Sequence, residues 1–571
     1  MDLRDRSHRP RRRTSRRLAL WSGLLLAAAA VVAPIAPNAP IPPNPRAAAA
    51  PTGPGATGTS AVGTAPALPA KAVVLGALAA DDPLQLTVVL QPRDPAGLAA
   101  LARSVGTPGS PDYRKFLAPG EFAQRFGPTD ATIAALQATL TDLGLHPAAI
   151  SGNRLAMPIT TTAGRATSAL GIHLRHVRLA GGRVAYANDA APRLPVRVAG
   201  AVQGIIGLDN LTQDQPAWRP APRPTTTVRP KAQAQSNPEN TAATTGPQPC
   251  AAATSAGINW GGYTANQIAQ AYSFNGLYAN NTLGTGVTIA LYELATYDAG
   301  DVAAFQACYG TSAPITNVNV DGGARPGDGG AVEVELDIEG AISMAPKASI
   351  AVYSGPNGSG SYDTYNRIVS DGTAKVISTS WGNCEAARTA TQVNNENTLF
   401  QQAAIQGQTI LSSAGDNGSE DCSTGTALSV DDPSAQPFVT SVGGTYLTAA
   451  GPPPAETVWN EAAGHFGAGG GGISTFWQMP PSQHGPGVIN GYSTRAACGS
   501  PVNTACRQVP DVSASADPGS GYMIFYTGSE TGTSGWQSIG GTSAAAPLWA
   551  AVVALADQNC SCALGDIKPT L

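Results

Sequence analysis

Val287-Thr-Ile-Ala-Leu-Tyr292 is a short apolar run typical of a buried strand, and it opens a stretch where such runs alternate with helical patterns. Three further runs have the same character and cover residues 349–353, 375–380 and 408–412. Helical patterns cover residues 330–344, 364–370 and 398–406. The alternation predicts an α/β domain with a mostly parallel sheet, helices on both faces, and functional residues at the carboxyl ends of strands.

Gly541-Thr-Ser-Ala-Ala-Ala-Pro547 places Ser543 at the start of a predicted helix, where free backbone amides stabilise negative charge. Ser543 is therefore a candidate nucleophile, although small residues at a helix start also serve close packing. After residue 200 the chain has two histidines, His465 in a glycine-rich loop and His484 before a Gly-Pro pair. Neither position suits a general base, so another group must activate Ser543.

A candidate base lies in Val332-Glu-Val-Glu-Leu-Asp-Ile-Glu-Gly-Ala341. On a helix that turns about 100° per residue, Glu333 and Asp337 lie side by side within the apolar arc. Glu335 and Glu339 fall on the opposite face, which we expect to be solvated. A carboxylate in an apolar arc is costly unless it is protonated, paired or functional, and two acids there can share one proton. A turn cap or a salt bridge is the structural alternative for the buried pair.

A third acid, Asp416, lies in Gly415-Asp-Asn-Gly418, directly after the strand expected at 408–412. By itself this sequence is typical of a turn. The three features complement each other, because the serine has no histidine, the acid pair has no basic partner, and the lone acid lies at a strand end. Together they predict a hydrolytic site made of Ser543 and carboxyl groups.

Composition limits the class of protein. A chain of 571 residues is expected to form two or more domains. Charged residues make up 13% of the chain and the net charge is -4. This composition excludes the strongly positive surface typical of proteins that bind nucleic acid.

The first 50 residues predict a secretory signal. They are arginine-rich up to Arg17, apolar over 18–33, and followed by small-residue sites that end at Ala48-Ala-Ala50. Ser15-Arg-Arg-Leu18 also resembles a twin-arginine signal. The apolar run is short for a membrane anchor, and no later segment is long and apolar enough to span a bilayer. We therefore expect a secreted, extracellular protein without membrane contact once the signal is removed.

Composition shifts divide the remaining chain into three parts. Residues 68–211 alternate strand-like runs, such as 84–90, with amphipathic helical patterns, such as 130–143, and predict an α+β domain. Residues 212–249 are rich in Pro, Thr, Ala, Gln and Asn and predict an exposed linker open to proteolysis. The α/β domain follows over 250–571.

All eight cysteines lie between Cys250 and Cys562, which fits an exported, oxidised domain. The pairing cannot be deduced, but sequence proximity suggests Cys498 with Cys506, Cys384 with Cys422, and Cys250 with Cys308. Cys560 and Cys562 are then left over, because a bond between them is expected to be strained. A metal site is a poor alternative, since no histidine or third cysteine lies near at ligand spacing.

Several motifs resemble, in chain order, those of the sedolisins, the serine-carboxyl peptidases, and above all kumamolisin-like members. These motifs are Glu333-x-x-x-Asp337, Ser378-Thr-Ser-Trp-Gly382, Ala414-Gly-Asp416, Val509-Pro-Asp-Val512 with Ala516-Asp-Pro518, and Gly540-Gly-Thr-Ser-Ala-Ala-Ala-Pro547. Upstream, Ser110-Pro-Asp-Tyr-Arg-Lys-Phe-Leu117 and Phe122-x-x-x-Phe-Gly-Pro128 resemble that family's activation domain. The resemblance covers about residues 68 to 571. It implies a subtilisin-like catalytic domain, a ferredoxin-like prodomain and acid endopeptidase activity.

The resemblance also implies residue roles. Ser543 is expected to be the nucleophile, Glu333 the base, Asp337 the residue that orients Glu333 and shares its proton, and Asp416 the protonated oxyanion partner. A carboxyl base titrates near pH 4 and a donor Asp must be neutral, so activity is expected in acid. The residues expected to line the substrate groove are Ser380, Gly382 and, within the glycine run 469–472, Gly470 and Gly471.

Leu564-Gly-Asp-Ile-Lys-Pro-Thr-Leu571 is similar to a family segment that precedes a calcium loop. By this resemblance calcium is expected as a cofactor, its ligands are expected beyond Leu571, and Asp566 is not one of them. The sequence then corresponds to a C-terminally truncated peptidase domain, with no metal ligand among the residues present.

The expected partners are protein or peptide substrates and the chain's own prodomain. We expect this prodomain to block the groove until acid loosens it and the enzyme cuts the linker itself. Two alternatives stay open: a tripeptidyl-peptidase of the same family, marked by closure of the groove at its non-primed end, and an inactive secreted binding protein on a protease fold. A histidine-dependent subtilisin fits poorly for lack of a suitable histidine.

Overall fold

A computed structural model of the chain describes residues 58–222 and 246–571, apart from 328, 359, 423–426, 452, 465, 496–497 and 500–503. The expected signal segment, most of the expected linker and His465 lie outside the described residues. Within them, none of the helices has the length and apolar character needed to cross a bilayer.

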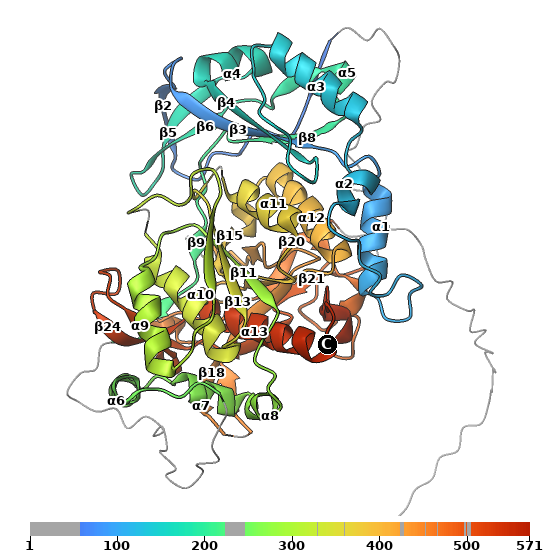
Figure 1. The fold of residues 1–571 in the computed structure, drawn as a ribbon. Coiled ribbons are helices and arrows are strands. Elements are labelled where there is room, and N and C mark those ends of the chain that lie inside the picture. The colour runs from blue at the N-terminus through green and yellow to red at the C-terminus, as the bar shows by residue number, and fades with distance from the viewer. Residues whose placement is uncertain are drawn as a thin grey trace, which may run out of the picture. The chain divides into compact units, whose positions relative to one another are not determined.

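The C-terminal domain is built on a large sheet (Figure 1) with strand order β12-β13-β11-β14-β16-β18-β19, and β22 also pairs with β18. Its pairings are parallel except that of β18 with β19. The strands are β11 (Thr288–Glu293), β12 (Ile315–Asn319), β13 (Ser349–Ser354), β14 (Val376–Thr379), β16 (Thr409–Ser413), β18 (Thr440–Ala449), β19 (Ala455–Val458) and β22 (Val512–Ser515). The predicted α/β fold with a mostly parallel sheet is confirmed, and the four expected strands all form.

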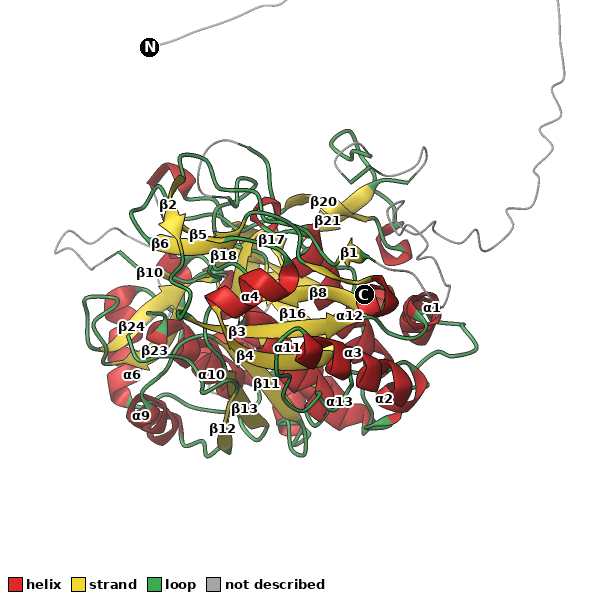
Figure 2. Cartoon of the chain, turned by 90° about the horizontal axis from the view of Figure 1, so that it is seen from above, coloured by secondary structure: helices red, strands yellow, loops and turns green. Residues whose placement is uncertain are grey.

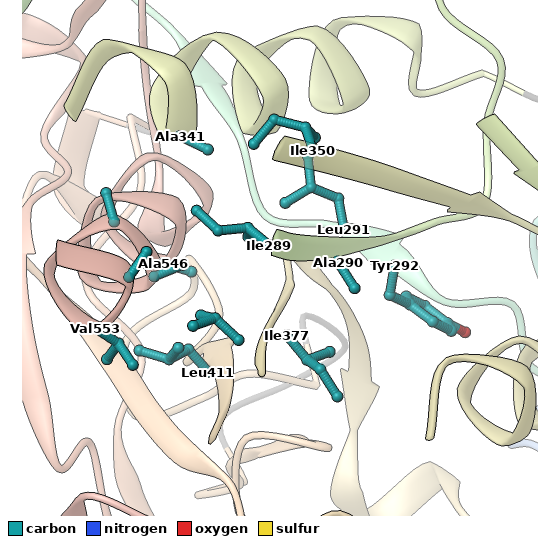
Figure 3. Close-up of a cluster of buried hydrophobic side chains, with 14 of the residues drawn as sticks. Ile289, Ala290, Leu291, Tyr292, Ala341, Ile350, Ile377, Leu411, Ala546 and Val553 are labelled. Atoms are coloured by element: carbon teal, nitrogen blue, oxygen red, sulfur yellow. The ribbon is translucent and has the colours of Figure 1, made fainter. Parts of the chain in front are cut away.

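Helices pack on both faces of this sheet. Helix α13 (Thr542–Cys560) contacts β11, β14, β16 and β18, and it also packs on α10 (Ala331–Met344). Because strand residues alternate in direction, Ile289 of β11 lies toward α13, whereas Tyr292 lies on the other side (Figure 3). There Tyr292 stacks on Tyr365 of α11 (Ser361–Asp371) with 3.9 Å between ring centroids. The sheet is therefore buried on both faces.

Helix α12 (Ala390–Ile405) begins a full two turns before the expected start at residue 398. The residues of its first two turns are mostly polar and show no helical spacing of apolar residues, which is why the earlier start was not predicted. The start is set instead by a capping box, in which Thr389 accepts from the Gln392 amide and the Gln392 side chain accepts from the Thr389 amide.

The N-terminal domain combines antiparallel strands with helices, so the predicted α+β class is confirmed. The strands β3 (Pro83–Leu90), β4 (Ala156–Thr162) and β8 (Val202–Ile206) lie side by side in the order β4-β3-β8 (Figure 2). A second sheet has the order β2-β5-β6, with bounds Val73–Ala77, Leu174–Arg178 and Val184–Asn188. The helices are α1 (Pro95–Gly106), α2 (Glu121–Arg125), α3 (Asp130–Asp142), α4 (Ala163–Leu170) and α5 (Val196–Ala199).

Four disulfides join cysteines of the C-terminal domain. Three are those suggested by sequence proximity: Cys250–Cys308, Cys384–Cys422 and Cys498–Cys506. The fourth joins Cys560 to Cys562, so the expectation that these two stay unpaired is wrong. Ser561 between them has a φ of 51°, and this left-handed turn at the end of α13 brings the two Cα atoms to 5.1 Å.

Candidate active site

Ser543 lies in the first turn of α13, directly after β24 (Gly535–Gly540). The connection is made by Gly541, whose φ of 110° is a conformation that residues with a side chain rarely adopt. The Ser543 side chain is fully buried, and its Oγ donates a hydrogen bond of 2.9 Å to Glu333 Oε2. The pairing of these two residues, expected from sequence, is present in the structure.

Glu333 reaches Ser543 because α10 and α13 pack closely. A methyl group on Gly340 of α10 would lie 3.1 Å from Pro547 Cγ of α13, so the missing side chain permits the approach. At its N-terminus α10 is capped by Glu530, which accepts from the amides of Gly330 and Ala331 at 2.8 and 3.2 Å. The first turn of α10, which carries Glu333, is thereby bound to the loop that precedes β24.

Three buried carboxyl groups form a chain behind Ser543: Glu333, Asp337 and Glu293. Ser380 Oγ donates to Asp337 Oδ1 at 2.7 Å, whereas Asp337 Oδ2 and Glu293 Oε1 are buried without a hydrogen-bond donor. Glu293 and Asp337 interact electrostatically, and a proton on one of the two carboxyls relieves their repulsion. Burial raises the pKa of Asp337 to about 7 and holds the pKa of Glu333 and of Glu293 well above the usual range. Repulsion from Asp337 raises the pKa of both glutamates further.

Glu293 and Trp381 were not identified from the sequence. Glu293 is the last residue of β11, and its Oε2 accepts from Trp381 Nε1 at 2.8 Å. The sequence contained a clue to each of them. Glu293 directly follows the first apolar run, at the carboxyl end of a strand, and Trp381 lies inside the motif Ser378-Thr-Ser-Trp-Gly382.

Asp416 lies on the other side of Ser543, three residues after the end of β16. Its Oδ1 accepts from the amide and from the hydroxyl of Thr542 at 2.8 and 3.0 Å, whereas its Oδ2 is buried without a hydrogen-bond donor. Burial raises the pKa of Asp416 to about 6, against the opposing effects of the Arg219 guanidinium and the Thr542 hydrogen bonds. A proton on Oδ2 can therefore persist in mild acid.

The segment 214–221 is held against this site, so the prediction of an exposed linker starting at Thr212 is wrong for these residues. Strand β9 (Gln215–Pro216) pairs with β15 (Trp381–Cys384), and β10 (Arg219–Pro220) pairs with β24. Between them the Ala217 amide donates to Ser380 O, and the Ala217 carbonyl accepts from the Ser543 amide, both at 3.1 Å. Composition predicted a linker because Pro and polar residues dominate there, but the backbone of the segment pairs with the edges of β15 and β24.

Ala217, Trp218 and Asp416 meet at Gly541. A methyl group on Gly541 would lie 2.2 Å from Ala217 O, 2.7 Å from Trp218 Cα and 2.8 Å from Asp416 Oδ2. The peptide bond between Ala217 and Trp218 therefore lies beside Ser543, with its carbonyl oxygen facing the same small space as Asp416 Oδ2. Arg219 follows, with its Nη1 3.9 Å from Asp416 Oδ2.

Glu335 and Glu339 differ from expectation, because both are buried with 1% exposure rather than solvated. Other parts of the chain cover helix α10 on all sides, so none of its faces is exposed to solvent. Glu335 Oε1 accepts from the Asp298 amide at 3.0 Å, and Glu339 Oε2 accepts from the Phe525 amide at 2.8 Å. Burial raises the pKa of Glu335 to about 9.

The residues expected to line the groove lie in two places. Ser380 and Gly382 belong to the edge that pairs with the segment, where Gly382 is opposite Gln215. Gly470 and Gly471 donate to the carbonyls of Gly415 and Gly418 at 2.8 and 3.3 Å. The latter two therefore contact the loop that carries Asp416.

Within the described parts of the chain, no three His, Cys, Asp or Glu side chains are grouped so that they could hold a metal ion. Asp566 accepts a hydrogen bond of 2.6 Å from Lys568 Nζ. The calcium expected from the family resemblance stays a prediction.

Comparison with known families gives two matches. The model described as "Pro-kumamolisin, activation domain" matches residues 70–211, and the model of the subtilase family matches residues 324–561.

Three curated proteins are similar over most of the chain. Kumamolisin from Bacillus sp. (strain MN-32) is 36% identical over 414 residues, which cover 71% of this chain and 67% of that protein. Sedolisin from Pseudomonas sp. (strain 101) is 32% identical over 507 residues, or 86% and 78% of the two chains. Tripeptidyl-peptidase 1 from Canis lupus familiaris is 25% identical over 517 residues, or 86% and 82%.

Proposed function

Because this chain belongs to the sedolisin family of serine-carboxyl peptidases, we propose that it is an acid-acting endopeptidase that uses Ser543, Glu333 and Asp337. The observation that carries the proposal is the 2.9 Å hydrogen bond from Ser543 Oγ to Glu333 Oε2. It gives the serine an acceptor for its proton at a site to which the described residues contribute no histidine. The same Ser543 donates its amide to a peptide carbonyl at 3.1 Å.

In the proposed reaction Ser543 Oγ attacks the carbonyl carbon of the scissile bond, and its proton passes to Glu333. Asp337 orients Glu333 and shares that proton. The carbonyl oxygen becomes an oxyanion that accepts from the Ser543 amide and from protonated Asp416. The proton on Glu333 then goes to the leaving amine as the peptide bond breaks, and a water molecule releases the acyl group by the same steps in reverse.

Acid action follows from Asp416, which must be protonated to donate. Its pKa of about 6 means that the donor is present below pH 6 and is lost as the pH rises through that value. Burial also raises the pKa of Glu333, which makes its ionised form a stronger base than a free carboxylate.

The chain is proposed to be made as an inactive precursor, in which the segment 214–221 fills the substrate groove. Its backbone pairs on both sides of Ser543, as an extended substrate does, and the bond from Ala217 to Trp218 lies at the nucleophile. Self-cleavage of this bond in acid is the proposed first step of maturation. Precursor with Ser543→Ala should stay uncut beside a parent that is processed, with no other protease present.

The extent of this segment favours an endopeptidase over a tripeptidyl-peptidase. A groove that releases tripeptides must close beyond the third non-primed residue, which here corresponds to Gln215. The segment instead continues to Asp214, whose Oδ1 lies 2.6 Å from Arg388 Nη2, and to Gln213, whose carbonyl accepts from Asn383 Nδ2 at 2.7 Å. Digestion of a long peptide should release internal fragments of varied length, whereas a ladder of tripeptides would support the alternative.

The central test is peptide hydrolysis from pH 2 to 8 by the parent, Ser543→Ala and Glu333→Ala. Loss of activity in both variants, with an acid optimum in the parent, supports the proposal. Ser529→Ala, a change at an exposed serine of the same domain, is the matched control and should keep full activity. An active Glu333→Ala enzyme would refute the assigned base, and inactivity of the parent at every pH would favour a binding protein on a protease fold.

Secretion is proposed from the expected signal in the first 50 residues and from the four disulfides, which persist in oxidising compartments. N-terminal sequencing of protein recovered from the culture medium tests this. Calcium support is tested separately, by the change in melting temperature when a chelator is added.

A further inference from the structure

Phe116 of the activation domain lies in a slot of the peptidase domain that is separate from the segment in the substrate groove. Two glycines form the walls of this slot, Gly407 just after α12 and Gly565 near Leu571. A methyl group on Gly407 would lie 2.6 Å from Phe116 Cδ2, and one on Gly565 would lie 2.6 Å from Phe116 Cζ. The ring therefore packs directly on both backbones, where any side chain would displace it.

The residues beside Phe116 are bound to the same surface. The Leu117 amide donates to Ile405 O at 2.7 Å, at the C-terminal end of α12. Arg114 Nη2 donates to Ala563 O at 2.9 Å and contacts Cys562 Sγ at 2.8 Å. Lys115 is exposed, whereas Arg114, Phe116 and Leu117 are partly buried against the peptidase domain.

The slot is held in shape by contacts within the peptidase domain. Thr409 Oγ1 donates to Gly565 O at 2.5 Å, and the Leu564 amide donates to Asp557 Oδ1 at 3.0 Å. The disulfide between Cys560 and Cys562 fixes the turn that leads into it. Because backbone atoms and a disulfide hold the slot in shape, little conformational entropy is lost when an aromatic ring binds in it.

We propose that this slot, formed by Gly407, Gly565 and the carbonyl of Ile405, is an anchoring site for the activation domain, with Phe116 as its central contact. The anchor acts independently of the segment in the groove, so the activation domain stays bound after the bond from Ala217 to Trp218 is cut. This consequence rests on the proposed precursor function, whereas the anchor itself does not require hydrolysis. It also gives the motif 110–117 a physical role, because its Phe and Leu are the residues that dock.

The test uses full-length protein carrying Ser543→Ala, in which the linker stays intact, and measures hydrogen exchange of the Leu117 amide. Phe116→Ala should reduce protection of this amide by about tenfold or more, the usual size for a central aromatic contact. Gly565→Ala should have a comparable effect because its methyl group collides with the ring. Gly310→Ala is the control, since Gly310 also has a positive φ of 66° but nothing lies within 4 Å of an added methyl group.

A double variant separates the collision from backbone strain. In the Phe116→Ala background the ring is gone, so Gly565→Ala should cause little further loss. Unchanged protection in Phe116→Ala, or equal effects of Gly565→Ala with and without the ring, would overturn the proposal.

A second measurement follows the parent after self-processing in acid and return to neutral pH. The severed activation domain should co-elute with the peptidase domain in gel filtration, and a synthetic peptide of residues 109–118 should compete it away. Other contacts, such as those of Asn153 with Asn366 and Gln402, also join the two domains, so Phe116→Ala protein should release a larger share of the activation domain than the parent does. Equal co-elution in Phe116→Ala and the parent would overturn the anchor, whereas a failure of the parent to process would count against the proposed function and leave the exchange result standing.

Discussion

Arg219→Gln is expected to raise the pH at which the precursor cuts itself by about one unit. Arg219 Nη1 lies 3.9 Å from Asp416 Oδ2, and among the described residues it is the cation in ion-pair contact with that carboxyl. The positive charge favours ionised Asp416, which cannot donate to an oxyanion. Glutamine keeps a polar side chain of similar reach and removes the charge.

The size of the shift follows from the geometry. An opposite charge within about 4–6 Å lowers the pKa of a carboxyl by about 1–3 units. Arg219 is 30% exposed while Asp416 is 1% exposed, so solvent screens the pair and favours the lower end of that range. The pKa of Asp416, about 6 with Arg219 present, should therefore approach about 7 in the variant, a change of about 1.4 kcal/mol. The other titratable groups that interact with Asp416 are Glu333 and Asp421, both acids.

The assay incubates purified precursor at intervals between pH 3 and pH 8 and measures the fraction cut after a fixed time. The pH midpoint of processing should move upward in Arg219→Gln and stay near the parent value in Arg219→Lys, which keeps the charge. Ser543→Ala provides the uncut baseline.

A midpoint that stays in place or moves downward in Arg219→Gln would refute this reasoning. A lower rate at every pH with the same midpoint would show that Arg219 contributes to binding of the segment and has no effect on the protonation of Asp416.

Three further changes have defined outcomes. Asp416→Ala should lower kcat by about 10²–10³-fold with little change in KM, because one donor to the oxyanion is lost; initial rates at acid pH measure this. Trp381→Phe removes the 2.8 Å donor to buried Glu293 and should destabilise the folded enzyme by about 1–3 kcal/mol, measured by urea unfolding at acid pH. Glu335 has a pKa of about 9 when folded and about 4.3 when unfolded, so the folded chain holds an extra proton between these values and loses stability as the pH rises. Glu335→Gln should therefore flatten the fall of melting temperature between pH 4 and pH 8, and an unchanged slope would contradict the assignment.

Local patterns predicted the parts of the fold that depend on near neighbours. The strands β11, β13, β14 and β16 were expected within one residue of each end, because each is an apolar run bounded by turn residues. Ser543 was expected at a helix start, because small residues follow a glycine pair. The side-by-side position of Glu333 and Asp337 follows from helix geometry alone, and the structure adds the contact with Ser543.

The features that were missed depend on segments far apart in the sequence. Glu335 and Glu339 are buried because β23 (Tyr522–Tyr526) and α9 (Ala299–Tyr309) cover the outer side of α10, which the pattern of α10 itself does not reveal. The sequence of the segment 214–221 has no apolar periodicity, so by itself it predicts a linker. Its backbone is bound by β15 and β24, whose residues lie more than 150 positions away.

In the proposed mechanism the two sides of Ser543 respond differently to pH. On the base side, Glu293, Glu333 and Asp337 form no ion pair with a Lys or Arg of the described chain, so they must retain a proton among them in the folded protein. On the oxyanion side, Asp416 faces Arg219 of the segment 214–221, and a single charge can shift its titration. The cut after Ala217 leaves Arg219 at the new N-terminal end of the peptidase chain. Once this end leaves the site, the cation no longer faces Asp416, so the mature enzyme should keep protonated Asp416 to a higher pH than the precursor does. The same contact would then delay self-cleavage at neutral pH and leave the released enzyme active over a broader acid range.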